Sequence, residues 1–266
     1  MNSSEIDALF ARTLLGGRED EVAWDAVRTL RLNGSREIFD RAAAWCKSPE
    51  PLKRARAADL LCQLQRAPLP NESLAETEWM FRDESYSLIT KMLENERDHV
   101  VLDGAITALG HLYNANAAPL ILRYQDHPDQ QVRFAVAFAL GCFPNEPQSI
   151  AGLLKLTWDS DDDVRDWAVF GLGVQGDADT PEIREALLRC LDDANEDVRE
   201  EAAVGLAKRR DPRVIPKLQT MLDEPEIGPR VRDAIAFFLS LDGEDVSEWT
   251  ADDCRSALAD KFNLQR

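Results

Sequence analysis

Apolar and small residues recur along the chain in a nine-residue phrase, and Arg usually stands in its second position. Positions 0, +4, +5 and +8 are apolar or small in nearly every copy, which makes one stripe along a helix of 3.6 residues per turn. The copies read VLDGAITAL from Val101, VRFAVAFAL from Val132, VRDWAVFGL from Val164, VREEAAVGL from Val198 and VRDAIAFFL from Val231. Their starts lie 31, 32, 34 and 33 residues apart, and a period of this length predicts stacked units of supersecondary structure.

Each phrase is predicted to be the second helix of a pair. Residues suited to cap a helix N-terminus stand three positions before it in four copies: Asp98, Asp129, Asp161 and Asn195. A shorter apolar-periodic stretch precedes each phrase, and Pro often opens it, as suits the first turn of a helix: Pro147, Pro181 and Pro212. The predicted repeat is therefore helix, short turn, helix and longer turn.

Two weaker copies, from Val22 and Leu52, extend the array upstream, with first helices expected at 4–15 and 35–46. The step from Leu52 to Val101 is 49 residues, so we expect a loop insertion near 66–85 rather than a domain boundary. A capping-box-like start at Thr250–Asp253 and an apolar stripe after it predict a capping helix near 250–263. Residues 1–266 are thus expected to form a single solenoid.

The repeat phrase resembles HEAT repeats of the bacterial subclass also seen in phycobilisome lyase subunits, whose second helices start with D-x-x-V-R-x-x-A-x-x-A-L-G. Asp129, Val132 and Arg133 carry the pattern in one copy. Two other copies depart from it: Gly228 stands in place of the motif's Asp, and Leu102 stands in place of its Arg. The resemblance implies an all-α fold, a right-handed α-solenoid of the armadillo-like or HEAT type, with about seven helix pairs plus the capping helix. It also implies that the second helices line a concave face.

The family's motif residues are structural, so the resemblance implies a role for the repeated arginines. In such repeats the Asp and Arg typically bond along the stack. We therefore expect the four arginines of the phrase to form a ladder between repeats rather than a ligand site. These arginines are Arg133, Arg165, Arg199 and Arg232.

Net charge is −18, and it is unevenly spread. Residues 134–266 hold 28 Asp and Glu against 15 Lys and Arg, which places −13 of the total in this half. Phosphate binding requires the opposite sign, so nucleic acid and anionic membrane surfaces are disfavoured as partners. Carboxylates in the turns exceed what helix N-termini explain, and the excess indicates a partner protein with a basic surface.

Other chemistry has little support in the sequence. The five cysteines are odd in number and widely spaced, unlike a disulfide framework or a zinc site. The N-terminus carries acids and no long apolar run, so we expect a cytoplasmic protein without a membrane segment. The sequence has three histidines, and it shows neither a legible catalytic arrangement nor a Gly-rich phosphate loop. We therefore expect a protein that is not an enzyme and that holds no cofactor or metal.

Candidate binding residues lie where the copies differ from one another. Positions +2 and +6 point away from the stripe of positions 0, +4 and +8, and several of them are aromatic or acidic. An aromatic patch rimmed by charge is typical of a protein-binding surface, although the rings could instead pack between adjacent second helices. With their neighbours and one acidic turn, the candidates are Phe134, Phe138, Asp166, Trp167, Phe170, Glu200, Glu201, Asp233, Phe237, Asp161, Asp162 and Asp163.

Three functions from different classes remain. The leading hypothesis is a non-enzymatic scaffold or adaptor that holds a basic protein, possible forms being an inhibitor or an immunity protein. The second, which rests on the resemblance alone, is a phycobilisome-lyase-like subunit or chaperone. The third is a HEAT-like DNA glycosylase, which needs a basic channel and is disfavoured by the net charge of −18.

Overall fold

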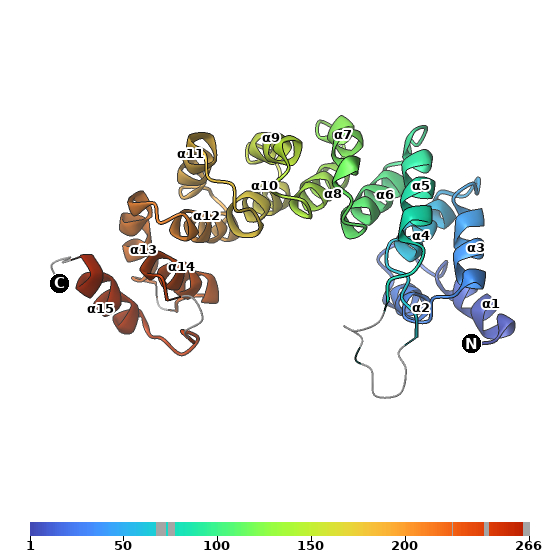
Figure 1. Cartoon of the computed structure of the whole chain (residues 1–266), viewed down its shortest axis with the longest axis horizontal. Helices are drawn as coiled ribbons and strands as arrows, with labels where there is room; N and C mark the ends of the chain where they lie inside the picture. Colours follow the sequence, from blue (N-terminus) through green and yellow to red (C-terminus); the bar gives the residue numbers. More distant parts are fainter. Residues whose placement is uncertain (68–72, 74–77, 225, 242–244, 263–266) are drawn as a thin grey trace. The chain divides into compact units, whose positions relative to one another are not determined.

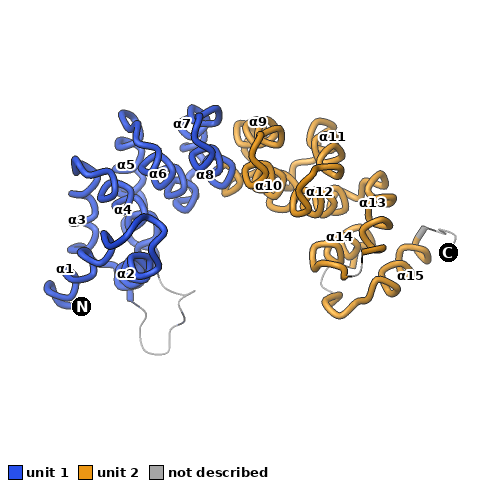
Figure 2. The backbone as a smooth tube through the Cα atoms, turned by 180° about the vertical axis from the view of Figure 1, so that it is seen from behind, with its two compact units in different colours: residues 1–139 blue, residues 140–266 orange. Residues whose placement is uncertain are grey.

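A computed structural model describes residues 1–67, 73, 78–224, 226–241 and 245–262. Its regular elements are helices, as the sequence predicts, and a single isolated antiparallel bridge joins Gln65 to Trp79 in the described part. The chain divides into two compact units, unit 1 (1–139) and unit 2 (140–266), which Figure 2 colours separately. Each unit is a stack of helix pairs.

Unit 1 begins with three helix pairs, α1 with α2, α3 with α4 and α5 with α6 (Figure 1). The second helices α2, α4 and α6 pack side by side. Short 3₁₀ turns flank α7, and α8 runs through the boundary between the units. The bounds are α1 Ser3–Arg12, α2 Glu21–Arg31, α3 Arg36–Trp45, α4 Pro51–Leu61, α5 Arg82–Leu93, α6 His99–His111, α7 Ala118–Ile121 and α8 Gln130–Gly141.

Unit 2 continues with the pairs α9 with α10, α11 with α12 and α13 with α14. Its second helices α10, α12 and α14 pack side by side, and α9, α11 and α13 lie along one side of them (Figure 1). We call α10, α12 and α14 the second-helix layer. The bounds are α9 Pro147–Leu156, α10 Asp162–Phe170, α11 Pro181–Cys190, α12 Glu196–Lys208, α13 Ile215–Met221, α14 Pro229–Leu239 and α15 Ala251–Phe262.

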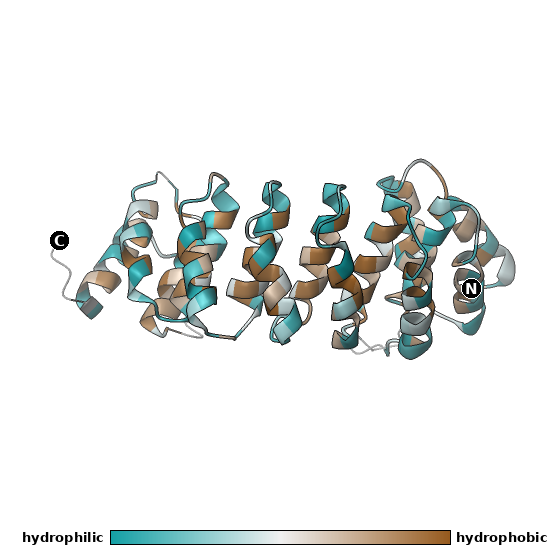
Figure 3. Cartoon of the chain, turned by 90° about the horizontal axis from the view of Figure 1, so that it is seen from above, coloured by the Kyte–Doolittle hydropathy of each residue, from teal (hydrophilic) through white to brown (hydrophobic). Residues whose placement is uncertain are grey.

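The repeat phrase fixes helix starts and core positions as predicted. The side chains of Asp98, Asp161 and Asn195 accept hydrogen bonds from backbone N–H groups in the first turns of α6, α10 and α12. Positions 0 and +8 are buried in every copy from Val101 to Leu239. Hydrophobic residues lie along the helix bodies, and the turns are mostly hydrophilic (Figure 3).

Arg165 bonds along the stack, whereas the role that the phrase arginines share lies within their own turn, so the full ladder stays a prediction. Nη1 of Arg165 donates to the carbonyls of Asp159 and Ser160, and Arg133 and Arg199 make the same pair of bonds from equivalent positions. Arg165 also makes a bidentate ion pair with Asp193 of the next repeat, at 2.8 Å from both Nε and Nη2. The Asp of the motif caps its own helix instead of pairing with Arg.

One core position of unit 1 departs from the apolar pattern. Arg56 occupies position +4 of the Leu52 copy and is fully buried. It donates to the carbonyls of Thr13 and Arg18 and pairs with Asp59, which also pairs with Arg18. Because a buried guanidinium is costly unless its donors are satisfied, this network ties the α1–α2 turn to α4.

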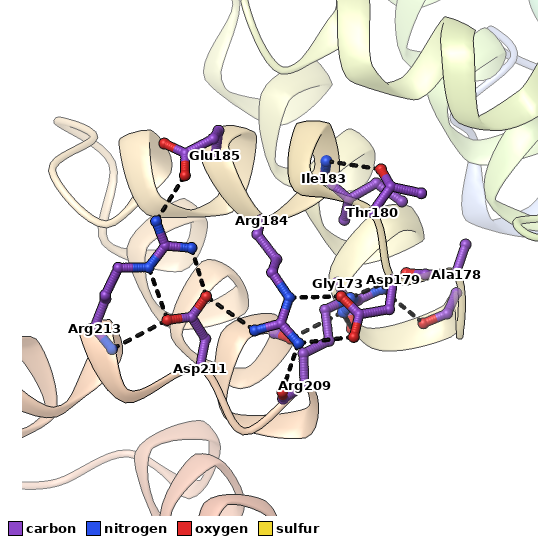
Figure 4. Close-up of polar contacts among 12 residues, drawn as sticks. Gly173, Ala178, Asp179, Thr180, Ile183, Arg184, Glu185, Arg209, Asp211 and Arg213 are labelled. Atoms are coloured by element: carbon purple, nitrogen blue, oxygen red, sulfur yellow. Dashed lines mark hydrogen bonds and ion pairs between the residues drawn. The ribbon is translucent and has the colours of Figure 1, made fainter.

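A π-helical turn, η4 (Gly171–Gln175), follows α10 and is held by Arg209 at the end of α12. The guanidinium of Arg209 donates to the carbonyls of Leu172, Gly173 and Ala178, two of which appear in Figure 4. Burial lowers the pKa of Arg209. The basic turn 208–210 therefore caps the carbonyl end of the preceding repeat.

The predicted loop insertion and the predicted capping helix are described to different extents. Residues 68–72 and 74–77 of the loop insertion expected near 66–85 lie outside the described residues, and its last part, from Arg82, is the start of α5. Helix α15 stands where a capping helix is expected, packs against α14 and buries Cys254 and Leu258. Thr250 and Asp253 form the expected hydrogen bonds at its start, whereas closure of the solenoid by α15 stays a prediction.

Candidate partner-binding surface

Acidic residues of the second-helix layer converge on one arginine. Nε of Arg230, on α14, lies 2.6 Å from Oε1 of Glu201, and its Nη1 lies 2.7 Å from Oδ1 of Asp197. A second carboxylate of α12, Glu200, is 3.6 Å from the same Nη1. Arg230 thus pairs with three carboxylates from the neighbouring repeat.

Asp166, on α10, adds a fourth carboxylate that is incompletely satisfied. Its Oδ1 is buried and has no hydrogen-bond partner among the described residues. Burial, followed by the nearby Asp197 carboxylate, raises the pKa of Asp166 to about 6. The layer therefore holds an acidic oxygen that a further donor could satisfy.

Glu201 is the most buried of these acids. Only 4% of it is exposed, although the sequence places it among candidates for an open surface. Burial raises its pKa to about 7, against the opposing effect of Arg230. The same cause, burial, raises the pKa of Glu200. We name Asp166, Asp197, Glu200, Glu201 and Arg230 the acidic cluster of unit 2.

The aromatic candidates are half-buried, and two of them, Trp167 and Phe170, lie close to this cluster in sequence. The rings of Trp167 and Phe170, both on α10, meet edge to face with centroids 5.5 Å apart. In unit 1, the ring of Phe138 lies against His111, with centroids 5.0 Å apart. Phe134 is also half-buried on α8. The structure thus brings Trp167 and Phe170 together in unit 2 and gives Phe138 a partner in unit 1.

The remaining candidates have separate environments. Asp161 is half-buried as the N-cap of α10, whereas Asp162 and Asp163 are exposed in its first turn. On α14, Asp233 is exposed and Phe237 is half-buried. Position +6 is not uniformly accessible, because Val204 of α12 is buried.

Two residues that the sequence did not single out matter in unit 2. Arg230 stands one position before the last copy of the phrase, and its partners come from the preceding repeat. Trp158, in the turn between α9 and α10, is 70% exposed. Its sequence signal was an aromatic residue just after an apolar helical stretch and directly before an acidic turn.

The described residues hold no group of three or more His, Cys, Asp or Glu side chains placed to bind a metal ion. Burial lowers the pKa of His111, and it raises the pKa of the Cys62 and Cys142 thiols to about 11. These thiols are therefore poor nucleophiles at neutral pH. Among the described helices, none combines the length and apolar character needed to cross a membrane.

Comparison with known proteins bears on the fold. Residues 86–173 and 151–240 match the family described as HEAT repeats. The chain belongs to the HEAT-repeat family. This confirms the resemblance in the repeat phrase and the all-α solenoid architecture, and no curated protein sequence matches the chain.

Three solved structures resemble this HEAT-repeat protein over most of its length. Escherichia coli YibA is 23% identical, with a TM-score of 0.71, covering 100% of this chain and 93% of YibA. An engineered protein is 17% identical with a TM-score of 0.51, and the match covers 98% of this chain and 72% of the engineered protein. A chain of the complex of CpcE and CpcF of phycocyanin lyase from Nostoc sp. PCC7120 is 21% identical with a TM-score of 0.45, and the match covers 90% of this chain and 83% of that chain. At these identities the likeness concerns the fold.

Proposed function

We propose that this HEAT-repeat protein is a non-enzymatic scaffold that holds a basic partner protein through the second-helix layer of unit 2, in the manner of an inhibitor or immunity protein. The observation that carries the proposal is the acidic cluster, in which Asp166 keeps a buried carboxylate oxygen that accepts no hydrogen bond from any described residue. The Asp166 side chain as a whole is half-buried, so a guanidinium or ammonium group of a partner could approach this carboxylate and supply a donor.

The surroundings of the cluster support the same partner chemistry. Trp167 and Phe170 offer half-buried aromatic surface next to Asp166 along α10. Aromatic contacts beside charged pairs are typical of the energetically important part of a protein interface. The charge of −13 in residues 134–266 would also steer a basic protein toward this unit.

The experiment is capture of partners by the full-length chain in its native host, followed by affinity measurement with the purified partner. We expect a partner with a basic surface, and binding that weakens between 50 and 300 mM salt, because exposed charges are screened over about 10 Å. The double variant Asp166→Asn/Glu201→Gln should weaken binding at least tenfold, since buried charge pairs are worth about 2–5 kcal/mol.

A matched control removes the same charge elsewhere. Glu21 and Glu94 are exposed in unit 1, so at pH 8, where Asp166 and Glu201 are also mostly ionised, Glu21→Gln/Glu94→Gln changes net charge nearly equally without touching the acidic cluster. If the two double variants weaken partner binding equally, the acidic cluster contributes only through net charge and is not a specific binding site. A partner that is acidic, or bound independently of salt, would exclude the proposed function.

A further inference from the structure

Trp158 is exposed at a place where the surrounding structure holds it firmly. It lies in the turn between α9 and α10, and 70% of it is open to solvent. The other large hydrophobic side chains exposed to a comparable degree in the described residues, Met1, Leu15, Val22 and Tyr113, all belong to unit 1. Single exposed hydrophobic residues are common, so the environment of Trp158 has to decide its role.

One face of the Trp158 ring is already occupied by a cation. The guanidinium carbon of Arg189, on α11, lies 3.5 Å from the ring centroid. Two hydrogen bonds hold that guanidinium, from Nη1 to the carbonyl of Thr157 at 3.2 Å and from Nη2 to its Oγ1 at 2.6 Å. Because 70% of Trp158 remains exposed, the opposite face of the indole is open.

The turn that carries Trp158 is tied to the next repeat at further points. Arg165 pairs with Asp193, and the Asn195 amide donates to Oδ2 of Asp162 at 2.9 Å. These bonds and those of Arg189 join the α9–α10 turn to α11 and to the α11–α12 turn. An aromatic side chain fixed in this way loses little conformational freedom on binding, which favours an anchor role.

The charge around Trp158 selects the occupant of its open face. Asp162 and Asp163 open α10 directly after the turn and are exposed, whereas Asp192 on the adjacent turn is exposed but pairs with Lys217 at 3.1 Å. An aromatic face beside carboxylates attracts a planar cation, and arginine stacks on indole more readily than lysine.

We propose that the open face of Trp158 binds an arginine side chain of the partner, with Asp162 and Asp163 facing its neighbouring cations. This inference rests on the proposed function, since it requires a basic partner. It adds a contact on the edge of unit 2, formed by the turns, that is separate from the acidic cluster of the second-helix layer.

The test uses the full chain and two labelled decapeptides of Gly and Ser that carry either four Arg or four Lys. We expect the Arg peptide to bind more tightly by fluorescence anisotropy. Trp158→Ala should weaken Arg-peptide binding about two- to fivefold and abolish the preference for Arg, the range given by an exposed cation–π contact. Tyr113→Asn is the matched control, because it removes an exposed aromatic ring from unit 1, and Asn tolerates the φ of 51° at this residue. It should change neither the affinity for the Arg peptide nor the preference for Arg over Lys.

A second measurement reads the indole directly. In protein that carries 5-fluorotryptophan, the ¹⁹F resonance of Trp158 is assigned by its loss in Trp158→Phe, and it should shift on addition of the Arg peptide. An unshifted resonance, an unchanged Arg preference in Trp158→Ala, or no binding of the Arg peptide would each overturn the inference. If Asp166→Asn/Glu201→Gln still weakens partner binding in that case, the proposed function stands without the Trp158 contact.

Discussion

Gly173 and Gly205 bring two consecutive repeats of unit 2 into backbone contact. A Cβ atom added to Gly205 of α12 would lie 2.6 Å from the Cα of Gly173 in η4. Arg209 donates to the carbonyls of both glycines, at 3.0 Å and 2.8 Å. The small residues of the phrase thus set the spacing between repeats, and any side chain at position 205 would have to push η4 away from α12.

Gly205→Ala should therefore destabilise the protein, although Ala normally favours a helix over Gly. The helix propensity gain of about 0.5–1 kcal/mol offsets only part of the overpacking cost of about 1–3 kcal/mol, so we expect a net loss of about 0.5–2 kcal/mol. Urea unfolding measures the difference. Gly17→Ala is the control, because no atom lies within 4 Å of its added Cβ, and it should be nearly neutral. Equal stability of the Gly205 variant and wild type would contradict the close contact.

The bidentate pair between Arg165 and Asp193 predicts a difference between otherwise equivalent arginines. Arg165→Ala should lose about 1–3 kcal/mol of unfolding free energy, because the pair is largely buried and its side chains are only 15% and 10% exposed. Arg199→Ala should cost less, since the described contacts of Arg199 are with carbonyls of its own turn. Arg165→Lys should not rescue stability, because lysine lacks the planar fork. A full rescue by lysine would show that charge alone matters there.

Much of the fold follows from the repeat phrase because its signals are local. Val at position 0 and Leu at +8 mark buried faces within a single helix, and Asp161 caps a helix only three residues away. Arg56 shows where local reasoning ends. Its place at a core position is visible in the sequence, but its partner carbonyl in Thr13 lies 43 residues earlier in the chain.

The candidate surface was harder to predict for the same reason. The pattern identified Asp166, Trp167 and Glu200 as residues that vary between repeats, yet it could not show that Glu201 is buried against Arg230 of the next repeat. Exposure of Trp158 depends on how the turn is held by Arg189, 31 positions later in the chain. Contacts between repeats therefore decide the chemistry of the surface, and the phrase specifies only the helices that carry it.

Asp211 links α11 to the turn after α12 and should be a stability determinant of unit 2. It accepts hydrogen bonds from Arg213 at 2.6 Å and from Arg184 at 3.0 Å, and its side chain is 3% exposed (Figure 4). These arginines, Arg213 first, hold the pKa of Asp211 far below its usual value. Asp211→Asn should lower the unfolding free energy at pH 7 by about 2–4 kcal/mol, because it leaves two guanidinium groups without their shared carboxylate.

The pH dependence of this effect has a definite sign. A depressed carboxylate pKa contributes stability above the unfolded pKa, near 4, and the contribution is lost as pH falls toward the folded value. The gap between wild type and Asp211→Asn should thus stay constant from pH 8 to 5 and narrow below pH 4. Asp179→Asn is a useful comparison, because Asp179 also pairs with Arg184 but is far more exposed. A gap that narrows already at pH 6 would point to a different group.

Glu201 should produce the opposite pH dependence, because its pKa of about 7 is raised above the usual value of 4.5. The folded protein binds this proton more tightly than the unfolded chain does, so the contribution is fully present below pH 4.5 and is lost as pH rises through 7. Groups around it act in both directions: Arg230 from α14 favours the carboxylate, whereas Asp166 from α10 and Glu200 on α12 oppose it.

Unfolding free energy should therefore fall by roughly 2–3 kcal/mol between pH 5 and pH 8 through Glu201, with Asp166 adding to the same slope. Glu201→Gln should remove most of this fall, and Asp166→Asn a smaller part, as measured by urea unfolding at pH 5, 6, 7 and 8. A cationic partner should restore the ionised forms, so its binding should release protons and strengthen from pH 5.5 to 8. If the fall in unfolding free energy between pH 5 and pH 8 is unchanged in Glu201→Gln, Arg230 keeps the Glu201 carboxylate ionised over this whole range. Raising the pH would then not strengthen partner binding through Glu201.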